Sequence, residues 1–117
     1  MNYVDQEKYL LSRKGSRVKF VYPTTDPVHK KMGTLEDRVV CFSREDGNVV
    51  YWNVIDKIRF EGKDWIRFTY YRYLTAQKKW VFAGQTSLCD PVENITSLFM
   101  KACEKDWFQK ILNNSEG

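Results

Sequence analysis

The sequence predicts a mainly β fold of the α+β class. We expect a bent antiparallel sheet or barrel of six to seven strands, closed by a C-terminal amphipathic helix. Short runs of β-branched and aromatic residues alternate with polar ones, hairpin signals separate these runs, and helical spacing begins only after residue 90. With 117 residues the chain has room for one core, so we expect a single domain, with its core over about 17–112 and a polar tail over 113–117.

The N-terminal third is expected to hold one strand followed by a long loop. Residues 17–22 alternate polar and apolar, which predicts a half-buried strand with Val18 and Phe20 pointing inward. Two prolines then interrupt the pattern, so we expect a loop as far as Gly33. For the first 16 residues, a short helix and an edge strand both remain open.

The middle of the chain is predicted to be a meander. A strand over residues 34–43 is followed by Asp46-Gly47-Asn48, a hairpin signal because glycine and asparagine accept positive φ. The return strand covers 49–55 and is followed by strict polar/apolar alternation over 56–60. A second turn is expected over 61–64. After a strand over 65–73, a short strand over 80–83 completes the meander.

The strand expected over 65–73 has two different faces. Ile66, Phe68 and Tyr70 form an apolar face that is expected to point inward. The opposite face is amphipathic and is expected to be exposed to water. It carries Trp65, Arg67, Thr69, Tyr71 and Tyr73.

The last segment carries a helix start. Asp90 can accept from free backbone donors, Pro91 suits the first helical position, and Glu93 matches a capping box. We therefore expect a helix over about 91–112 that packs an apolar stripe against the sheet. The stripe comprises Ile95, Leu98, Phe99, Ala102, Cys103, Trp107 and Ile111.

Charge is unevenly distributed along the chain, whose net charge is +4. Residues 1–34 carry seven Lys or Arg against three Asp or Glu, and residues 65–84 carry four against none. If the fold brings these two segments together, their positive field favours an anionic partner.

Several classes of protein are not expected. Cys41, Cys89 and Cys103 are odd in number and far apart, which predicts reduced thiols rather than disulfides or a metal site. His29 is the only histidine, and no phosphate-binding loop is present. We therefore expect no enzyme, no catalytic residues, no cofactor and no metal. No apolar run is long enough to span a membrane, so we expect an intracellular protein, cytoplasmic or nuclear.

Several short motifs resemble the pleckstrin-homology superfold, in particular GRAM domains and the pleckstrin-like domain of the transcription and repair factor TFIIH. The resemblance implies a PH-like fold that serves as an interaction module rather than an enzyme. The motifs are the Gly-x-Leu strand start and arginine within Met32–Phe42, the Asp-x-Ile element Asp56-Lys57-Ile58, the last strand Lys79–Gly84, the helix aromatic Trp107 and the basic run His29-Lys30-Lys31.

We therefore predict a non-catalytic module that binds an anionic partner. An acidic protein segment is favoured over a phosphoinositide headgroup or anionic membrane surface, because aromatic residues interleave with the basic ones and the basic spacing differs from that of lipid-binding members. The predicted ligand-binding residues are Lys19, His29, Lys30, Lys31, Arg38, Arg67, Tyr71, Arg72 and Tyr73. Two alternatives stay open: a small β-barrel that binds single-stranded nucleic acid, and a structural or assembly subunit. The oligomeric state is also open.

Overall fold

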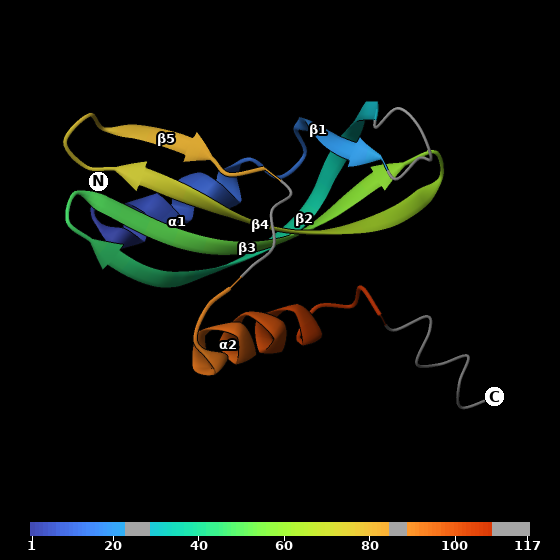
Figure 1. Cartoon of the computed structure of the whole chain (residues 1–117). Coiled ribbons are helices and arrows are strands. Elements are labelled where there is room, and N and C mark those ends of the chain that lie inside the picture. The colour runs from blue at the N-terminus through green and yellow to red at the C-terminus, as the bar shows by residue number, and fades with distance from the viewer. Residues whose placement is uncertain (23–28, 85–88, 109–117) are drawn as a thin grey trace.

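The computed structural model describes residues 1–22, 29–84 and 89–108. Its elements in chain order are α1 (Tyr3–Ser12), β1 (Arg17–Tyr22), β2 (His29–Asp46), β3 (Val49–Phe60), β4 (Lys63–Leu74), β5 (Lys79–Phe82) and α2 (Val92–Cys103). The strands form one antiparallel sheet in sequence order, a meander (Figure 1). This confirms the mainly β, α+β class. The described residues form five strands rather than six or seven, and the sheet is not closed into a barrel, because its edge strands β1 and β5 do not pair.

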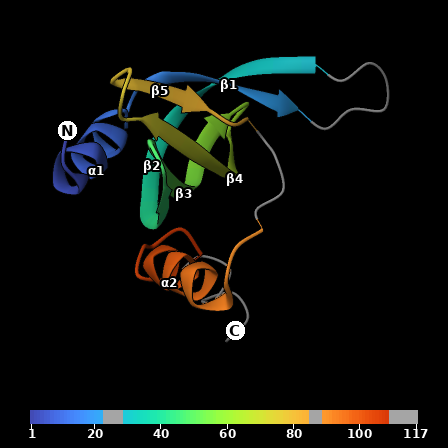
Figure 2. The same ribbon diagram turned by 60° about the vertical axis from the view of Figure 1, so that its left-hand side comes forward.

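The two helices cover opposite faces of the sheet. On one face, Leu10 of α1 packs into a cluster of buried side chains from β2, β3 and β4. On the other face, Leu98 and Ala102 of α2 pack against Val39 and Ile55. Figure 2 shows α2 below the strands and apart from α1. The prediction that the C-terminal helix packs on its own sheet is therefore confirmed, although α2 covers a face rather than closing an end.

The N-terminal segment is a helix, which decides between the two structures left open above. The Asn2 side chain caps it by accepting a hydrogen bond of 2.8 Å from the Asp5 amide. Gln6 is buried, and its side-chain oxygen Oε1 accepts from the Trp52 indole at 2.8 Å. Helix α1 is thus anchored to the sheet by a polar bond as well as by Leu10.

The predicted loop extends too far: it was expected to reach Gly33, but the chain is already in a strand from His29. Strand β2 begins at His29 and pairs with β1 in the register Tyr22↔His29 to Arg17↔Thr34. The backbone groups of β1 need partners, and the start of β2 supplies them. Residues 23–28 of that loop lie outside the described residues. Phe20 is buried as predicted.

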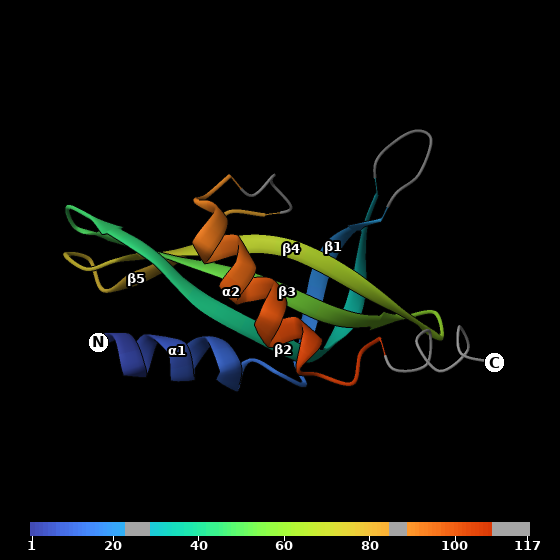
Figure 3. The ribbon, with the colours of Figure 1, turned by 90° about the horizontal axis from the view of Figure 1, so that it is seen from below.

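Helix α2 is shorter than predicted. It ends at Cys103, and the following chain turns so that the Trp107 indole donates to Asp37 at 2.9 Å. Figure 3 shows α2 running across the sheet near β2 and β3. The helix contacts mainly β2 and β3, through one side only. Phe99 and Cys103 of the expected stripe lie outside that contact and remain exposed. Residues 109–117, which include Ile111, lie outside the described part of the chain.

Candidate functional site

The two faces of β4 are the reverse of the prediction. Arg67 is 5% exposed and Thr69 is fully buried, whereas Ile66 and Phe68 are 36% and 41% exposed. The reason lies on β3, where Asp56 is the register partner of Arg67 and shares its face. The polar residues satisfy one another inside the molecule, so this face becomes the interior.

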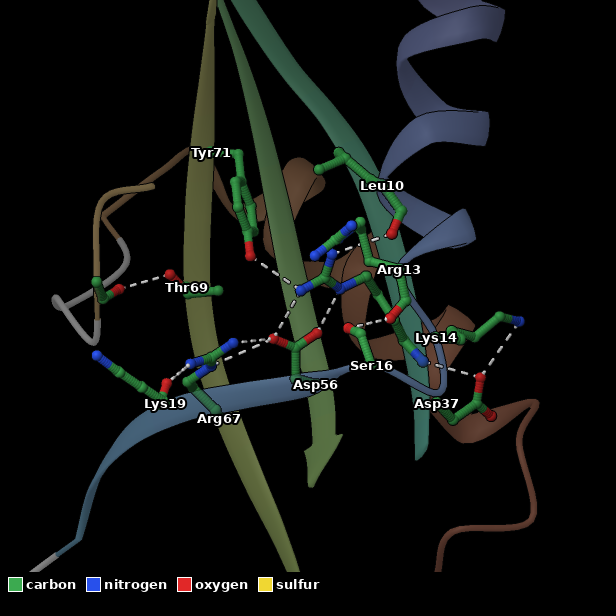
Figure 4. Close-up of polar contacts among 12 residues, drawn as sticks. Leu10, Arg13, Lys14, Ser16, Lys19, Asp37, Asp56, Arg67, Thr69 and Tyr71 are labelled. Atoms are coloured by element: carbon green, nitrogen blue, oxygen red, sulfur yellow. Dashed lines mark hydrogen bonds and ion pairs between the residues drawn. The ribbon is translucent and has the colours of Figure 1, made fainter. Parts of the chain in front are cut away.

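A buried carboxylate, Asp56, lies between two arginines. Its Oδ1 accepts from Nε of Arg38 at 2.6 Å, and its Oδ2 accepts from Nη2 of Arg38 at 3.1 Å. The same Oδ2 accepts from Nη2 and Nε of Arg67 at 2.7 and 3.2 Å. Figure 4 shows Asp56 facing Arg67, with Tyr71 and Leu10 nearby. We call Arg38, Asp56 and Arg67 the arginine–aspartate cluster.

The outer hydrogen bonds of this cluster join separate parts of the fold. Arg38 donates from Nη1 to the Leu10 carbonyl of α1 at 3.0 Å and from Nη2 to the Tyr71 hydroxyl at 3.0 Å. Arg67 donates from Nη1 to the Lys19 carbonyl of β1 at 2.9 Å. An arginine side chain therefore connects the edge strand β1 to β4.

The electrostatics of the cluster favour charged arginines. Burial opposes the charge of Arg38, but the hydrogen bonds and charge of Asp56, followed by the interaction with Tyr71, outweigh it and raise the pKa of Arg38. Arg38 also lies 5.0 Å from the Tyr71 ring centroid, and Arg67 lies 4.9 Å from that of Phe82. Both guanidinium groups are directed at protein acceptors, so Arg38 and Arg67 do not belong to a surface site.

The nine predicted site residues therefore do not form one surface. Arg38, Arg67 and half-buried Tyr71 meet in the interior, and Tyr73 is buried beneath α1. Arg72 is half-buried on the opposite face of β4, and its Nε has no hydrogen-bond partner within the described ranges.

Lys19 and Lys31 are exposed, on β1 and on the start of β2. Neither has an ion pair with any residue in the described part of the chain. The backbones of His29 and Lys30 belong to β2, and their side chains lie outside the described atoms.

Sequence reasoning missed Arg17 as a surface cation. Arg17 is exposed and lies two residues before Lys19, so both project from the same face of β1. The signal was present, because Val18 and Phe20 were expected to point inward and an alternating strand then exposes residues 17 and 19.

A second polar feature surrounds Asp90 before α2. A cavity of about 160 Å³ is lined by Ser43, Arg44, Tyr51, Asn53, Tyr70, Cys89 and Asp90. Asp90 does not cap the helix as predicted, because Pro91 is the N-cap residue and the Asp90 carboxylate accepts from Ser43, Asn53 and Asn94 at 2.7–3.1 Å. Burial raises the pKa of Asp90, but these bonds and the charge of Arg44 outweigh it and lower the pKa overall. The Asp90 carboxylate therefore already has hydrogen-bond donors from within the protein.

In comparisons with family models, curated proteins and solved structures, this chain has no match. The sheet with a C-terminal helix is compatible with a PH-like fold, and no match confirms the resemblance to GRAM or TFIIH domains. Neither helix of the described ranges is long and apolar enough to cross a membrane. No cluster of metal-binding side chains occurs among these residues.

Proposed function

We propose that this chain is a non-catalytic interaction module that binds an acidic segment of another protein through β1 and the start of β2. The observation that carries the proposal is the contrast between two sets of cations. The buried Arg38 and Arg67 have protein acceptors, whereas Arg17, Lys19 and Lys31 are exposed without an ion pair in the described ranges. We call residues 17–20 and 31–34 the basic arm. Such cations attract a negatively charged partner.

A protein segment suits the basic arm better than a phosphate headgroup. Met32 is the register partner of Lys19 and is 42% exposed, so an apolar contact lies beside the positive charge. A peptide can use both, because its side chains supply carboxylates and apolar atoms. A phosphate headgroup would gain more from a convergent set of arginines, and the arginines Arg38 and Arg67 face Asp56 instead.

Single-stranded nucleic acid is less well supported, because the rings expected to stack on bases are largely used inside the protein. Tyr73 is buried, and the Tyr71 hydroxyl accepts a hydrogen bond from Arg38. Trp65 is half-buried and packs against the cluster that contains Phe20. Base stacking needs an exposed aromatic face.

The test is a titration of the protein at low salt with an Asp/Glu-rich peptide, with anionic vesicles and with single-stranded RNA. A double variant, Arg17→Glu with Lys19→Glu, changes two cations on one face of β1. It is compared with the double variant Lys8→Glu with Lys78→Glu, which alters the net charge equally at exposed sites outside the basic arm. We expect the first variant to lose about tenfold in peptide affinity, because two favourable contacts of up to about 1 kcal/mol each are removed. The control variant should retain most of the affinity.

Three results would contradict the proposal. The peptide could fail to bind at low salt, the two double variants could lose affinity equally, or the vesicles or RNA could bind more tightly than the peptide. The last result would assign the basic arm to a lipid or nucleic-acid ligand instead.

A further inference from the structure

Part of β4 has an edge that no described strand covers. Strand β5 pairs with β4 only from Tyr71 to Leu74, and the Ala83 amide donates to the Tyr70 carbonyl at 3.1 Å. In an antiparallel ladder, alternate residues direct their amide and carbonyl groups to the same side. Asp64, Ile66 and Phe68 therefore direct theirs to the open edge, away from β3. No described residue bonds to that side of them.

The same residues present apolar side chains at the surface. Ile66 and Phe68 are exposed on the face that carries α2, and the Phe99 ring of α2 lies 5.7 Å from that of Phe68 in an edge-on arrangement. Phe99 also lines a hollow of about 460 Å³ along α2, together with Thr96, Met100, Cys103 and Glu104. An apolar strip therefore runs along the open edge.

The other side of this edge is positively charged. Lys63 is exposed at the start of β4 and alternates with Asp64, Ile66 and Phe68, so it belongs to the opposite face. The backbone of Lys19 lies in the same region, because its carbonyl accepts from Arg67, and Figure 4 shows the Lys19 side chain extending beyond Arg67, away from β3. Neither lysine has an ion pair in the described ranges.

We propose that the open edge of β4 docks an extended segment of a partner protein, which adds to the sheet as a further strand. The segment alternates apolar and acidic residues. Its apolar side chains pack on Ile66, Phe68 and Phe99, and its carboxylates face Lys19 and Lys63. The inference rests on the proposed function, since it specifies how the acidic partner binds.

A second copy of this chain does not have the required pattern. If two β4 strands paired across this edge, the side chains opposite Lys63 would come from Lys63, Trp65, Arg67 and Thr69 of the other copy. None of these is acidic, so the positive charge would remain unpaired. Charge complementarity therefore favours a different, acidic chain.

The test uses a short peptide of alternating valine and glutamate, measured by fluorescence anisotropy, with amide exchange read at Ile66 and Phe68. One control peptide has the same composition in separate valine and glutamate blocks. A second control is N-methylated at alternate residues, which removes the donors that a strand ladder needs. We expect slower exchange at both amides with the alternating peptide, and about tenfold weaker binding of each control.

Protein variants test the apolar strip. Ile66→Ser with Phe68→Ser should weaken binding of the alternating peptide about tenfold, because it removes the apolar contact without changing the charge. The matched control is Val4→Ser with Val92→Ser, which makes the same change at two exposed apolar positions elsewhere. If circular dichroism shows that the first variant has unfolded, the N-methylated peptide on the unchanged protein decides the question.

The outcomes separate this inference from the proposed function. Equal binding of the block and alternating peptides, with no protection of Ile66 and Phe68, would overturn edge docking and leave the acidic-partner proposal standing. Failure of every acidic peptide to bind would overturn both. Self-association in light scattering that is lost in the Ile66 and Phe68 variant would identify a second copy as the occupant and overturn the inference.

Discussion

Asparagine at position 56 would remove the negative charge from the arginine–aspartate cluster. Asp56 is fully buried, and its two oxygens accept four guanidinium hydrogen bonds of 2.6–3.2 Å from Arg38 and Arg67. Asparagine has a similar size, but it keeps one acceptor oxygen and turns an NH₂ donor towards the arginines. Two buried cations would then lack a counter-charge.

The expected cost is large because the pair is buried. Removing one partner of a buried ion pair costs about 3–5 kcal/mol, against a total stability of about 5–15 kcal/mol for a domain of ordinary size. With a urea dependence of about 2 kcal/mol per molar, the urea midpoint of Asp56→Asn should fall by about 2 M.

The assay is urea unfolding at pH 7, followed by circular dichroism and tryptophan fluorescence. The matched control is Asp64→Asn, because Asp64 is an exposed carboxylate whose bond to Arg59 is 3.1 Å. That variant should lose less than about 1 kcal/mol. Arg67→Met should cost less than Asp56→Asn, because it leaves Arg38 and Asp56 as a neutral pair.

The double variant Asp56→Asn with Arg67→Met should be less destabilised than the sum of the single variants, because it removes one of the two uncompensated charges. Equal urea midpoints for Asp56→Asn and Asp64→Asn would show that the buried arginines do not need the charge of Asp56. Strict additivity of the Asp56 and Arg67 changes would point to the same conclusion.

Two other features make predictions for stability. Burial raises the pKa of Asp37 and Asp90, but hydrogen bonds and neighbouring cations outweigh it and hold both below the ordinary value of 3.8. The two carboxylates therefore stabilise the fold above pH 3.8, and this stabilisation is lost as the pH falls through their lowered pKa values. When the urea midpoint is measured against pH, the Asp90→Asn variant should show a smaller fall at acid pH than the unchanged protein. Gly33→Ala should lower the free energy of unfolding by about 1–3 kcal/mol, measured with urea, because the alanine Cβ would lie 2.6 Å from Ile58 Cγ2 and 3.0 Å from the Arg59 carbonyl. An unchanged urea midpoint would show that β2 can shift to make room.

Much of the fold could be predicted because its signals are local. The turn Gly47-Asn48 separates β2 from β3 as expected, and Gly47 has a φ of +61°. The alternation over 17–22 correctly placed Phe20 in the core. The start of α2 was also close to its prediction, since proline and an acidic first turn act within a few residues.

The candidate site was harder to predict because exposure depends on distant partners. Lys19 was named and is exposed, whereas Arg38 and Arg67 were named for their charge and are buried. No residue next to Arg38 or Arg67 in the sequence indicates that a carboxylate lies on the neighbouring strand. Asp56 was noticed only as part of a motif, and its position between two arginines depends on the register of three strands.

Alternation along residues 65–73 predicts that β4 is a strand with two chemically different faces, because alternation is a property of consecutive residues. Which of the two faces lies inside depends on contacts with other strands and with α1. Asp56 and α1 lie on the side of Arg67, so hydrogen bonds and burial there outweigh the exposure of Ile66 and Phe68 on the other side. That choice leaves an apolar strip beside an open strand edge, since one sheet can bury both faces only where a helix covers each.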